Sequence, residues 1–140
     1  MKTLAIDFGE RRIGIAVSDA DGILAMPLET LVRRSDAQVI SEIAAIVARE
    51  NIESLVVGEP RRLDGSRGDM ARRAASFARK IAARTALPYV LVNESLTSHE
   101  AKRRLEEAGV NTRRNPERID AVAAQILLEE ALGLRRGRQL

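Results

Sequence analysis

The chain has 140 residues, enough for one domain with a substantial buried core and too few for two domains of ordinary size. Hydrophobic residues make up 45% and charged residues 31% of it, and the lack of a long charge block or a low-complexity tract argues against a disordered chain. The absence of cysteine excludes disulfides, thiolate metal sites and a cysteine nucleophile, and with aromatic residues at only 2% an aromatic platform for stacking bases is not expected.

The charge balance is compatible with a polyanionic partner. The formal net charge is +3, the sequence pI is about 9.9, and almost all of the basic residues are arginine. A planar guanidinium suits phosphate oxygens, although a high arginine content also follows genome base composition. The sequence begins on a strand pattern and holds no uncharged run of about 18 residues, so we expect a cytoplasmic protein with neither a signal peptide nor a membrane span.

The beginning of the chain predicts three consecutive strands. Apolar runs cover residues 3–8 and 12–18, with a tight link between them, and a third run covers residues 23–31 after a turn rich in Asp and Gly. Three strands joined by such short links predict an antiparallel meander.

Helices and strands then alternate. Ser35 and Gln38 form a capping-box pattern, followed by helical spacing of apolar residues to about Asn51. The remaining predicted elements are strands at 54–58 and 89–92 and helices at 70–82 (capped by Ser66), 97–109 and 116–133. The order βββαβαβα-α predicts an α/β fold with a mixed five-stranded sheet, made of the meander and two parallel strands and flanked by helices. We expect one domain over residues 1–134 and a basic tail over 135–140.

Three of the predicted strands end in an acidic residue, and a fourth acid lies near the start of the last helix. Asp7, Glu59 and Glu94 each follow an apolar run, and ligands of such sheets collect at the carboxyl ends of parallel strands. Asp120 is flanked by apolar residues. Each acid alone is compatible with an ordinary surface position, and only the set is informative.

Carboxylates gathered in one place repel each other unless divalent cations neutralise them. Oxygen ligands without histidine or cysteine support suit Mg²⁺ or Mn²⁺. Two such ions about 4 Å apart can activate a water and stabilise the leaving oxygen in phosphodiester hydrolysis. The acidic set therefore predicts a metal-dependent enzyme acting on phosphodiester bonds.

Basic residues flank the predicted acidic site in three loops. The candidate nucleic-acid-binding residues are Arg11, Arg12, Arg61, Arg62, Arg67, Arg113 and Arg114. If the three loops border one cleft, a nucleic acid is the simplest partner, whereas the alternative is a solvated arginine surface without a partner. His99, the only histidine, is a weaker candidate for a proton shuttle.

Four segments resemble a known family. They are AIDFG at 5–9 with RIGIA at 12–16, VVGEPRRLDGS at 56–66, ESLTSHEA at 94–101 and IDAVAAQILL at 119–128. In this order and spacing they resemble the YqgF family, also called RuvX or pre-16S rRNA nuclease, over residues 2–132. The resemblance implies an RNase H-like fold, dependence on Mg²⁺ or Mn²⁺, and a nuclease that trims the 5′ end of the rRNA precursor in pre-ribosomal particles. Related members are described as Holliday junction resolvase-like, so branched DNA is an alternative substrate.

Carried over by position, the resemblance implies that Asp7, Glu94 and Asp120 are the catalytic and metal-binding residues. Asn93 and Ser95 stand where the family usually has an acid and an arginine. Glu59 stands where the family usually has an apolar residue, so it is either an additional metal ligand or an acid without a role in catalysis.

Two other classes of function remain open. The substitutions Asn93 and Ser95 favour a nucleic-acid-binding module with a degraded site, although the three acids are all retained. Gly9 and Gly14 give the first hairpin a likeness to the phosphate-binding hairpin of actin-like ATPases, which enclose ATP between two such domains where this chain has room for one.

Overall fold

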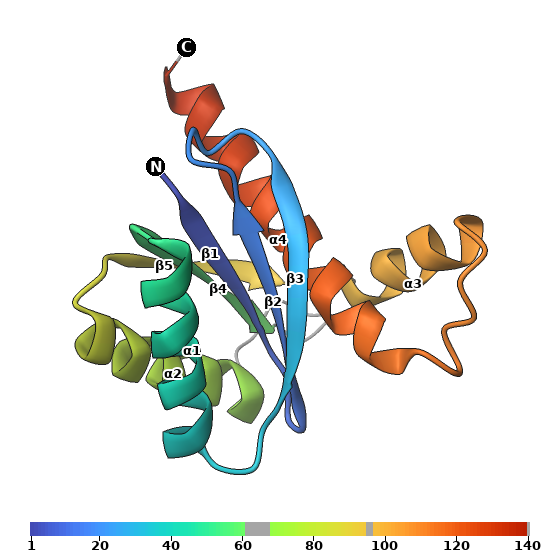
Figure 1. The fold of residues 1–140 in the computed structure, drawn as a ribbon, viewed down its shortest axis with the longest axis horizontal. Helices are drawn as coiled ribbons and strands as arrows, with labels where there is room; N and C mark the ends of the chain where they lie inside the picture. Colours follow the sequence, from blue (N-terminus) through green and yellow to red (C-terminus); the bar gives the residue numbers. More distant parts are fainter. Residues whose placement is uncertain (61–67, 95–96, 140) are drawn as a thin grey trace.

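A computed structural model of the chain describes residues 1–60, 68–94 and 97–139; the side chains of Glu94 and of residues 134–139 are outside this description. The elements, in chain order, are β1 (Thr3–Phe8), β2 (Arg12–Ser18), β3 (Ala25–Val32), α1 (Asp36–Glu50), β4 (Ser54–Pro60), α2 (Asp69–Thr85), β5 (Tyr89–Glu94), α3 (Thr97–Glu107) and α4 (Pro116–Gln139). These strands form one sheet in the order β3-β2-β1-β4-β5 (Figure 1). The predicted α/β class and element order are confirmed.

The sheet is mixed, as the order of elements predicts. β2 pairs antiparallel with β1 and β3, whereas β4 pairs parallel with β1 and β5. The first two strands have their predicted limits, but β3 begins at Ala25 instead of Ile23. The cause is local, because Asp19 Oδ1 accepts hydrogen bonds from the amides of Ile23 (2.7 Å) and Leu24 (3.1 Å) and keeps both residues in the turn. These hydrogen bonds also hold the pKa of Asp19 below its usual value.

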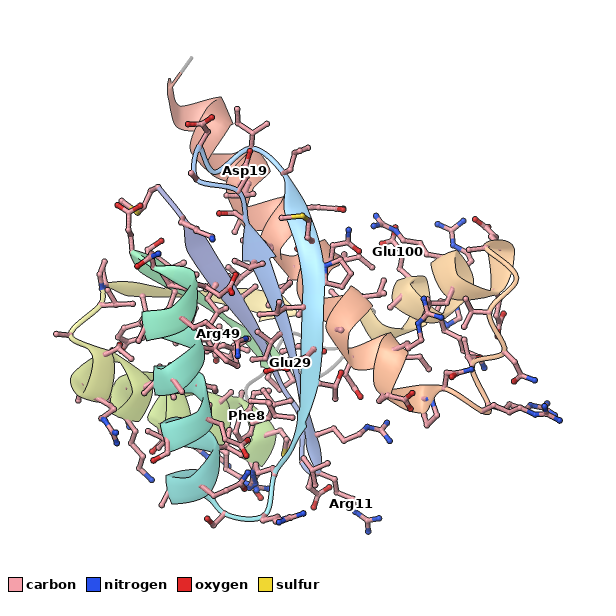
Figure 2. The ribbon with its side chains drawn as sticks, in the orientation of Figure 1. Phe8, Arg11, Asp19, Glu29, Arg49 and Glu100 are labelled. Atoms are coloured by element: carbon pink, nitrogen blue, oxygen red, sulfur yellow. The ribbon has the colours of Figure 1, made fainter. Side chains whose placement is uncertain are left out.

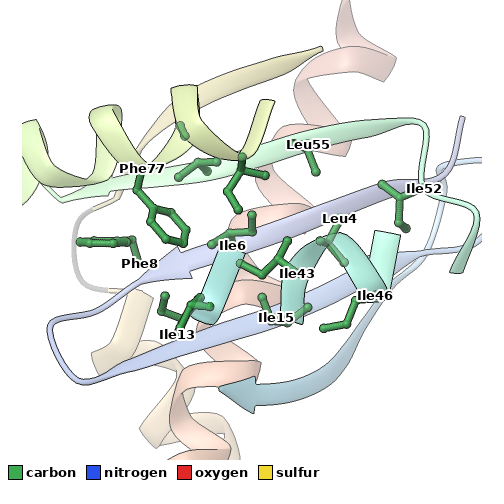
Figure 3. Packing of buried hydrophobic residues seen from close by; sticks show 14 of the residues in the cluster. Leu4, Ile6, Phe8, Ile13, Ile15, Ile43, Ile46, Ile52, Leu55 and Phe77 are labelled. Carbon is green, nitrogen blue, oxygen red and sulfur yellow. The ribbon is translucent and has the colours of Figure 1, made fainter. Parts of the chain in front are cut away.

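Alternate residues of the strands face two different cores. Ile6 and Phe8 of β1 pack beneath α1 and α2, where the rings of Phe8 and Phe77 have centroids 5.0 Å apart (Figure 3). Ala5 belongs to a second core, which α4 covers. Side chains of a strand point alternately to the two faces, so the parity of a residue decides which helices it meets. The same rule decides which face of the sheet each acid of a strand occupies.

The start of α1 is as predicted, and the start of α2 is not. Ser35 and Gln38 form the complete capping box, and α1 ends at Glu50 with Asn51 as its C-cap. The N-cap of α2 is Gly68, so the prediction of Ser66 as the cap is wrong, and Ser66 itself lies outside the described residues. The helix begins with Asp69, whose negative charge suits a helix N-terminus.

The last helix runs further than the sequence pattern indicates. α4 continues through Gly133 to Gln139, so the predicted stop at Gly133 is wrong. An isolated glycine costs a helix only about 1 kcal/mol relative to alanine. Leu128 and Leu132, which precede it, are buried against the sheet and hold the helix in place.

The third helix packs on α4 and not on the sheet (Figure 1). Ala101 of α3 is buried with Ala123 and Ile126 of α4. Arg104 donates two hydrogen bonds to the Glu129 carboxylate, at 3.2 and 3.1 Å, and this contact raises the pKa of Arg104. Within the described ranges, no helix combines the length and the apolar character needed to cross a membrane.

Candidate functional site

Asp7 lies in the middle strand, near its carboxyl end. It is level with Gly14 of β2 on one side and with Gly58 of β4 on the other. Asp7 is buried, at 7% exposed. By alternation with Ala5 it faces α4. Because both neighbours are glycine, no side chain of an adjacent strand stands beside it at this level of the sheet.

A backbone contact brings α4 to the same level. A Cβ atom on Gly14 would lie 1.9 Å from the carbonyl oxygen of Asp120 and 2.3 Å from its carbonyl carbon. The Asp120 peptide therefore occupies the space that any side chain at position 14 would need. Gly14 thus brings Asp120, from the other end of the chain, onto the strand next to Asp7.

Arg12 forms an ion pair with Asp120. Its Nε donates to Asp120 Oδ2 at 2.7 Å. Arg12 has the parity of Gly14 and Ala16, so its position lies on the face of the sheet that α4 covers. The side chains are 43% exposed for Arg12 and 18% for Asp120, so water reaches the pair. The sequence predicted both residues for the site but not their contact.

Glu59 lies on the other face of the sheet. Leu55 and Val57 pack in the core beneath α1 and α2, and Glu59 has their parity in β4. It is buried, at 4% exposed. Asp7 faces α4, so the structure does not bring these two carboxylates to one face. Its burial also excludes the ordinary surface position with which each acid alone was compatible in the sequence.

Several predicted site residues fall outside the described part of the structure. The backbone of Glu94 ends β5 opposite Pro60, but its side chain is not described. Arg61, Arg62, Arg67 and Ser95 belong to the undescribed segments. Asn93 is exposed on β5, and His99 is exposed on α3.

The described carboxylates suit a hard divalent cation by their chemistry. Asp7 is a buried carboxylate and Asp120 is partly buried, and both belong to elements that meet at Gly14. Oxygen donors of this kind are those that Mg²⁺ and Mn²⁺ prefer. Among the side chains that the structure describes, no group of three or more His, Cys, Asp or Glu could hold a metal ion. The third carboxylate of the predicted set, Glu94, is the one whose side chain is not described.

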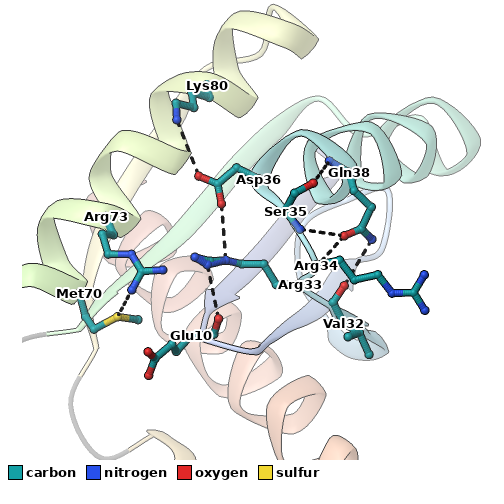
Figure 4. A network of polar contacts seen from close by, with 10 residues as sticks. All are labelled: Glu10, Val32, Arg33, Arg34, Ser35, Asp36, Gln38, Met70, Arg73 and Lys80. Atoms are coloured by element: carbon teal, nitrogen blue, oxygen red, sulfur yellow. Dashed lines mark hydrogen bonds and ion pairs between the residues drawn. The ribbon is translucent and has the colours of Figure 1, made fainter.

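The β1–β2 hairpin carries Arg11 at its tip, where the side chain points away from the body of the molecule (Figure 2). The hairpin is anchored by Arg33, whose amide donates to the Arg11 carbonyl oxygen at 2.8 Å and whose Nη1 donates to the Glu10 carbonyl oxygen at 3.4 Å (Figure 4). The Arg33 guanidinium also lies 5.2 Å from the Phe8 ring centroid and pairs with Asp36 at 3.5 Å. These contacts fix the hairpin that presents Arg11 and Arg12.

The other described arginines of the predicted set precede α4. Arg113 and Arg114 are exposed, and their amides donate to Asn111 Oδ1 at 3.0 and 3.2 Å, which holds the turn that they occupy. The turn leads into the first turns of α4, which carry Asp120. It therefore presents two cations on the approach to the same helix end.

A cleft of about 300 Å³ separates β3 from the start of α4. Its walls carry Glu29 on β3 and Glu117 and Arg118 on α4. The hydroxyl of Thr30 donates to the Glu117 carbonyl oxygen at 2.5 Å and joins the two walls. Two carboxylates against one guanidinium give this cleft little attraction for phosphate.

Comparison with known proteins decides the family. A family model described as RuvX, Holliday junction resolvase, matches residues 1–133. The chain belongs to the RuvX family. A relative from Mycobacteroides abscessus is 44% identical over 139 residues, which is 96% of this chain and 82% of the relative. A relative from Maridesulfovibrio salexigens is 39% identical over 129 residues, which is 92% of this chain and 96% of the relative. Both relatives are provisionally named pre-16S rRNA nucleases.

The fold of this RuvX-family chain is also found in a resolvase structure. T. thermophilus RuvC in complex with a Holliday junction substrate superposes with a TM-score of 0.63 at 17% identity, covering 98% of this chain and 96% of that one. This likeness confirms the RNase H-like fold that the resemblance implied.

The position of Gly14 in the site was not predicted. The sequence does hold a signal for it, since a glycine inside a buried apolar strand commonly marks a close approach of another backbone. That signal does not tell which backbone approaches. The ion pair of Arg12 with Asp120 could not be predicted for the same reason, because it depends on where α4 packs against β2.

Proposed function

We propose that this RuvX-family chain is a metal-dependent nuclease that hydrolyses phosphodiester bonds. The observation that carries the proposal is the buried carboxylate of Asp7 in the middle strand, between two glycines, with the Asp120 turn of α4 packed on the neighbouring strand. A buried carboxylate is costly unless a positive group meets it, so this position is suited to holding a cation.

We assign the metal-holding role to Asp7 and Asp120, with Glu94 as the third carboxylate. Bound Mg²⁺ or Mn²⁺ would supply a water of lowered pKa and neutralise the charge that develops on the phosphate. Asp7 gives a ligand fixed by the sheet, and Asp120 gives one fixed by the contact of α4 with Gly14. Arginines of the hairpin and of the turn before α4 would bind the nucleic-acid backbone without reading its sequence.

The substrate that we propose is the 5′ end of the 16S rRNA precursor, within or released from pre-ribosomal particles. The names of the relatives from Mycobacteroides abscessus and Maridesulfovibrio salexigens support this choice. A four-way DNA junction is the second candidate, supported by the description of the family model and by the fold shared with RuvC. Both substrates present closely spaced phosphates to the same acids.

The experiment compares both substrates under identical conditions. A precursor RNA carrying the 5′ extension and a four-way DNA junction are incubated with the chain and Mn²⁺ or Mg²⁺, with EDTA as the control. We expect RNA cleavage that EDTA abolishes and weaker cleavage of the junction. Preferential cleavage of the junction would favour the resolvase function. Binding of both substrates with cleavage of neither would leave a binding module with a degraded site.

A further inference from the structure

Arg12 holds the carboxylate that the proposed function assigns to a metal ion. Its Nε donates a hydrogen bond to Asp120 Oδ2 at 2.7 Å. The guanidinium therefore already binds one of the two oxygen atoms through which Asp120 would bind a cation. The two residues are far apart in the sequence and meet because α4 packs on β2 at Gly14. The pair is therefore built into the fold and is not a contact between neighbours in the chain.

We propose that Arg12 is an internal competitor of the divalent metal at Asp120. A metal that binds Asp120 through Oδ2 displaces the guanidinium, which is then available to a phosphate of the nucleic acid. This inference rests on the proposed function, because it takes Asp120 as a metal ligand, and it adds that the chain's own cation regulates how tightly that ligand accepts a metal.

The partial exposure of the ion pair makes such an exchange feasible. The Arg12 side chain is 43% exposed, so water can hydrate its charge when it leaves Asp120, and no buried charge is left without compensation. Ion pairs of this exposure contribute little, typically about twofold to fivefold in an equilibrium constant. A divalent ion coordinated by carboxylates can overcome a contribution of this size. The guanidinium would also repel a divalent cation that arrives beside it.

The exchange predicts that metal binding and nucleic-acid binding support each other. Before metal binding, Asp120 neutralises Arg12 and weakens its attraction for phosphate. Once the metal holds Asp120, the same guanidinium faces the substrate as a full positive charge. Arg12 would thus couple the two binding events through one side chain.

The test measures Mn²⁺ binding to the chain alone, by electron paramagnetic resonance of free Mn²⁺ at low salt, without nucleic acid. Arg12→Gln removes the competing charge and should tighten Mn²⁺ binding by about threefold to fivefold. Arg11→Gln is the matched control, since it removes the same charge from the same hairpin, at the exposed tip. We expect this control to change Mn²⁺ binding by less than about 1.5-fold, and we expect high salt to reduce the difference between the two variants.

Asp7→Asn, measured in the same way, separates the inference from the proposed function. If Asp7→Asn weakens Mn²⁺ binding while Arg12→Gln leaves it unchanged or weaker, the metal site stands and Arg12 positions Asp120 instead of competing for it, which overturns the inference. If the parent binds no Mn²⁺, or if Asp7→Asn binds it as the parent does, the proposed metal site and the inference are both wrong. If Arg11→Gln and Arg12→Gln tighten Mn²⁺ binding equally, the effect comes from the overall charge of the hairpin and not from the contact with Asp120. This result would also overturn the inference.

Discussion

Glu59 is a buried carboxylate on the face of the sheet that α1 and α2 cover, whereas Asp7 is a buried carboxylate on the face that α4 covers. The two acids follow similar apolar runs, and adjacent strands carry them, yet the sheet itself separates them. At the scale of single residues, parity within a strand decides which acids can act together. The structure therefore favours the alternative in which Glu59 takes no part in metal binding.

We predict that Glu59→Gln leaves the metal requirement of cleavage unchanged. The Mn²⁺ concentration for half-maximal cleavage should stay within about twofold of that of the parent, because a carboxylate on the other face of the sheet does not reach the metal. Asp120→Asn, titrated in parallel, should raise that concentration by about tenfold or more, as loss of a charged ligand does. A comparable rise in Glu59→Gln would show that Glu59 is a ligand.

The position of Asp7 near the end of a buried strand could be predicted from the sequence, because an apolar strand pattern directly precedes it. The placement of Glu59 could not, because it depends on the register in which β4 pairs with β1, and the sequence does not encode that register locally. Likewise, the contact of Arg12 with Asp120 depends on where a distant helix crosses the sheet.

At the scale of elements, the crossing of α4 over β2 places Asp120 at the proposed site. The Asp120 peptide fills the space above Gly14, so the helix and the strand are in direct backbone contact. The local elements before it could be predicted, since β1, β2 and the capping box of α1 depend on neighbouring residues. The end of α4 could not, because packing on the sheet outweighs the cost of Gly133.

The surroundings of Gly14 in β2 and of Gly133 in α4 predict opposite effects on stability when each is replaced by alanine. Gly14→Ala places a methyl group against the backbone of Asp120, which cannot rotate away, so the free energy of unfolding should fall by about 1–3 kcal/mol or more. Gly133→Ala, in the same α4, meets nothing within 4 Å and should raise it by about 0.5–1 kcal/mol. Urea unfolding followed by circular dichroism measures both. Equal stability of Gly14→Ala and the parent would contradict the close contact.

At the scale of the whole molecule, the sheet lies between α1 and α2 on one face and α4 on the other, and α3 is attached through α4 (Figure 1). The proposed site lies where the middle strand and α4 meet, near the hairpin that carries Arg11 (Figure 2). Asp19 lies at the opposite end of β2 from this site (Figure 2). Asp19 is therefore an aspartate far from the proposed site, and it serves as a control position for Asp7.

The metal-holding role of Asp7 is best tested by the cleavage rate of Asp7→Asn on whichever substrate the parent cleaves, with saturating Mn²⁺. Asparagine keeps the shape of the side chain and removes the charge that would hold the metal, so the rate should fall by about a thousandfold or more while the thermal unfolding midpoint stays close to that of the parent. Asp19→Asn should cleave like the parent, because its side-chain oxygen can still accept the turn hydrogen bonds from Ile23 and Leu24. Cleavage by a folded Asp7→Asn at the rate of the parent would contradict the metal-dependent site.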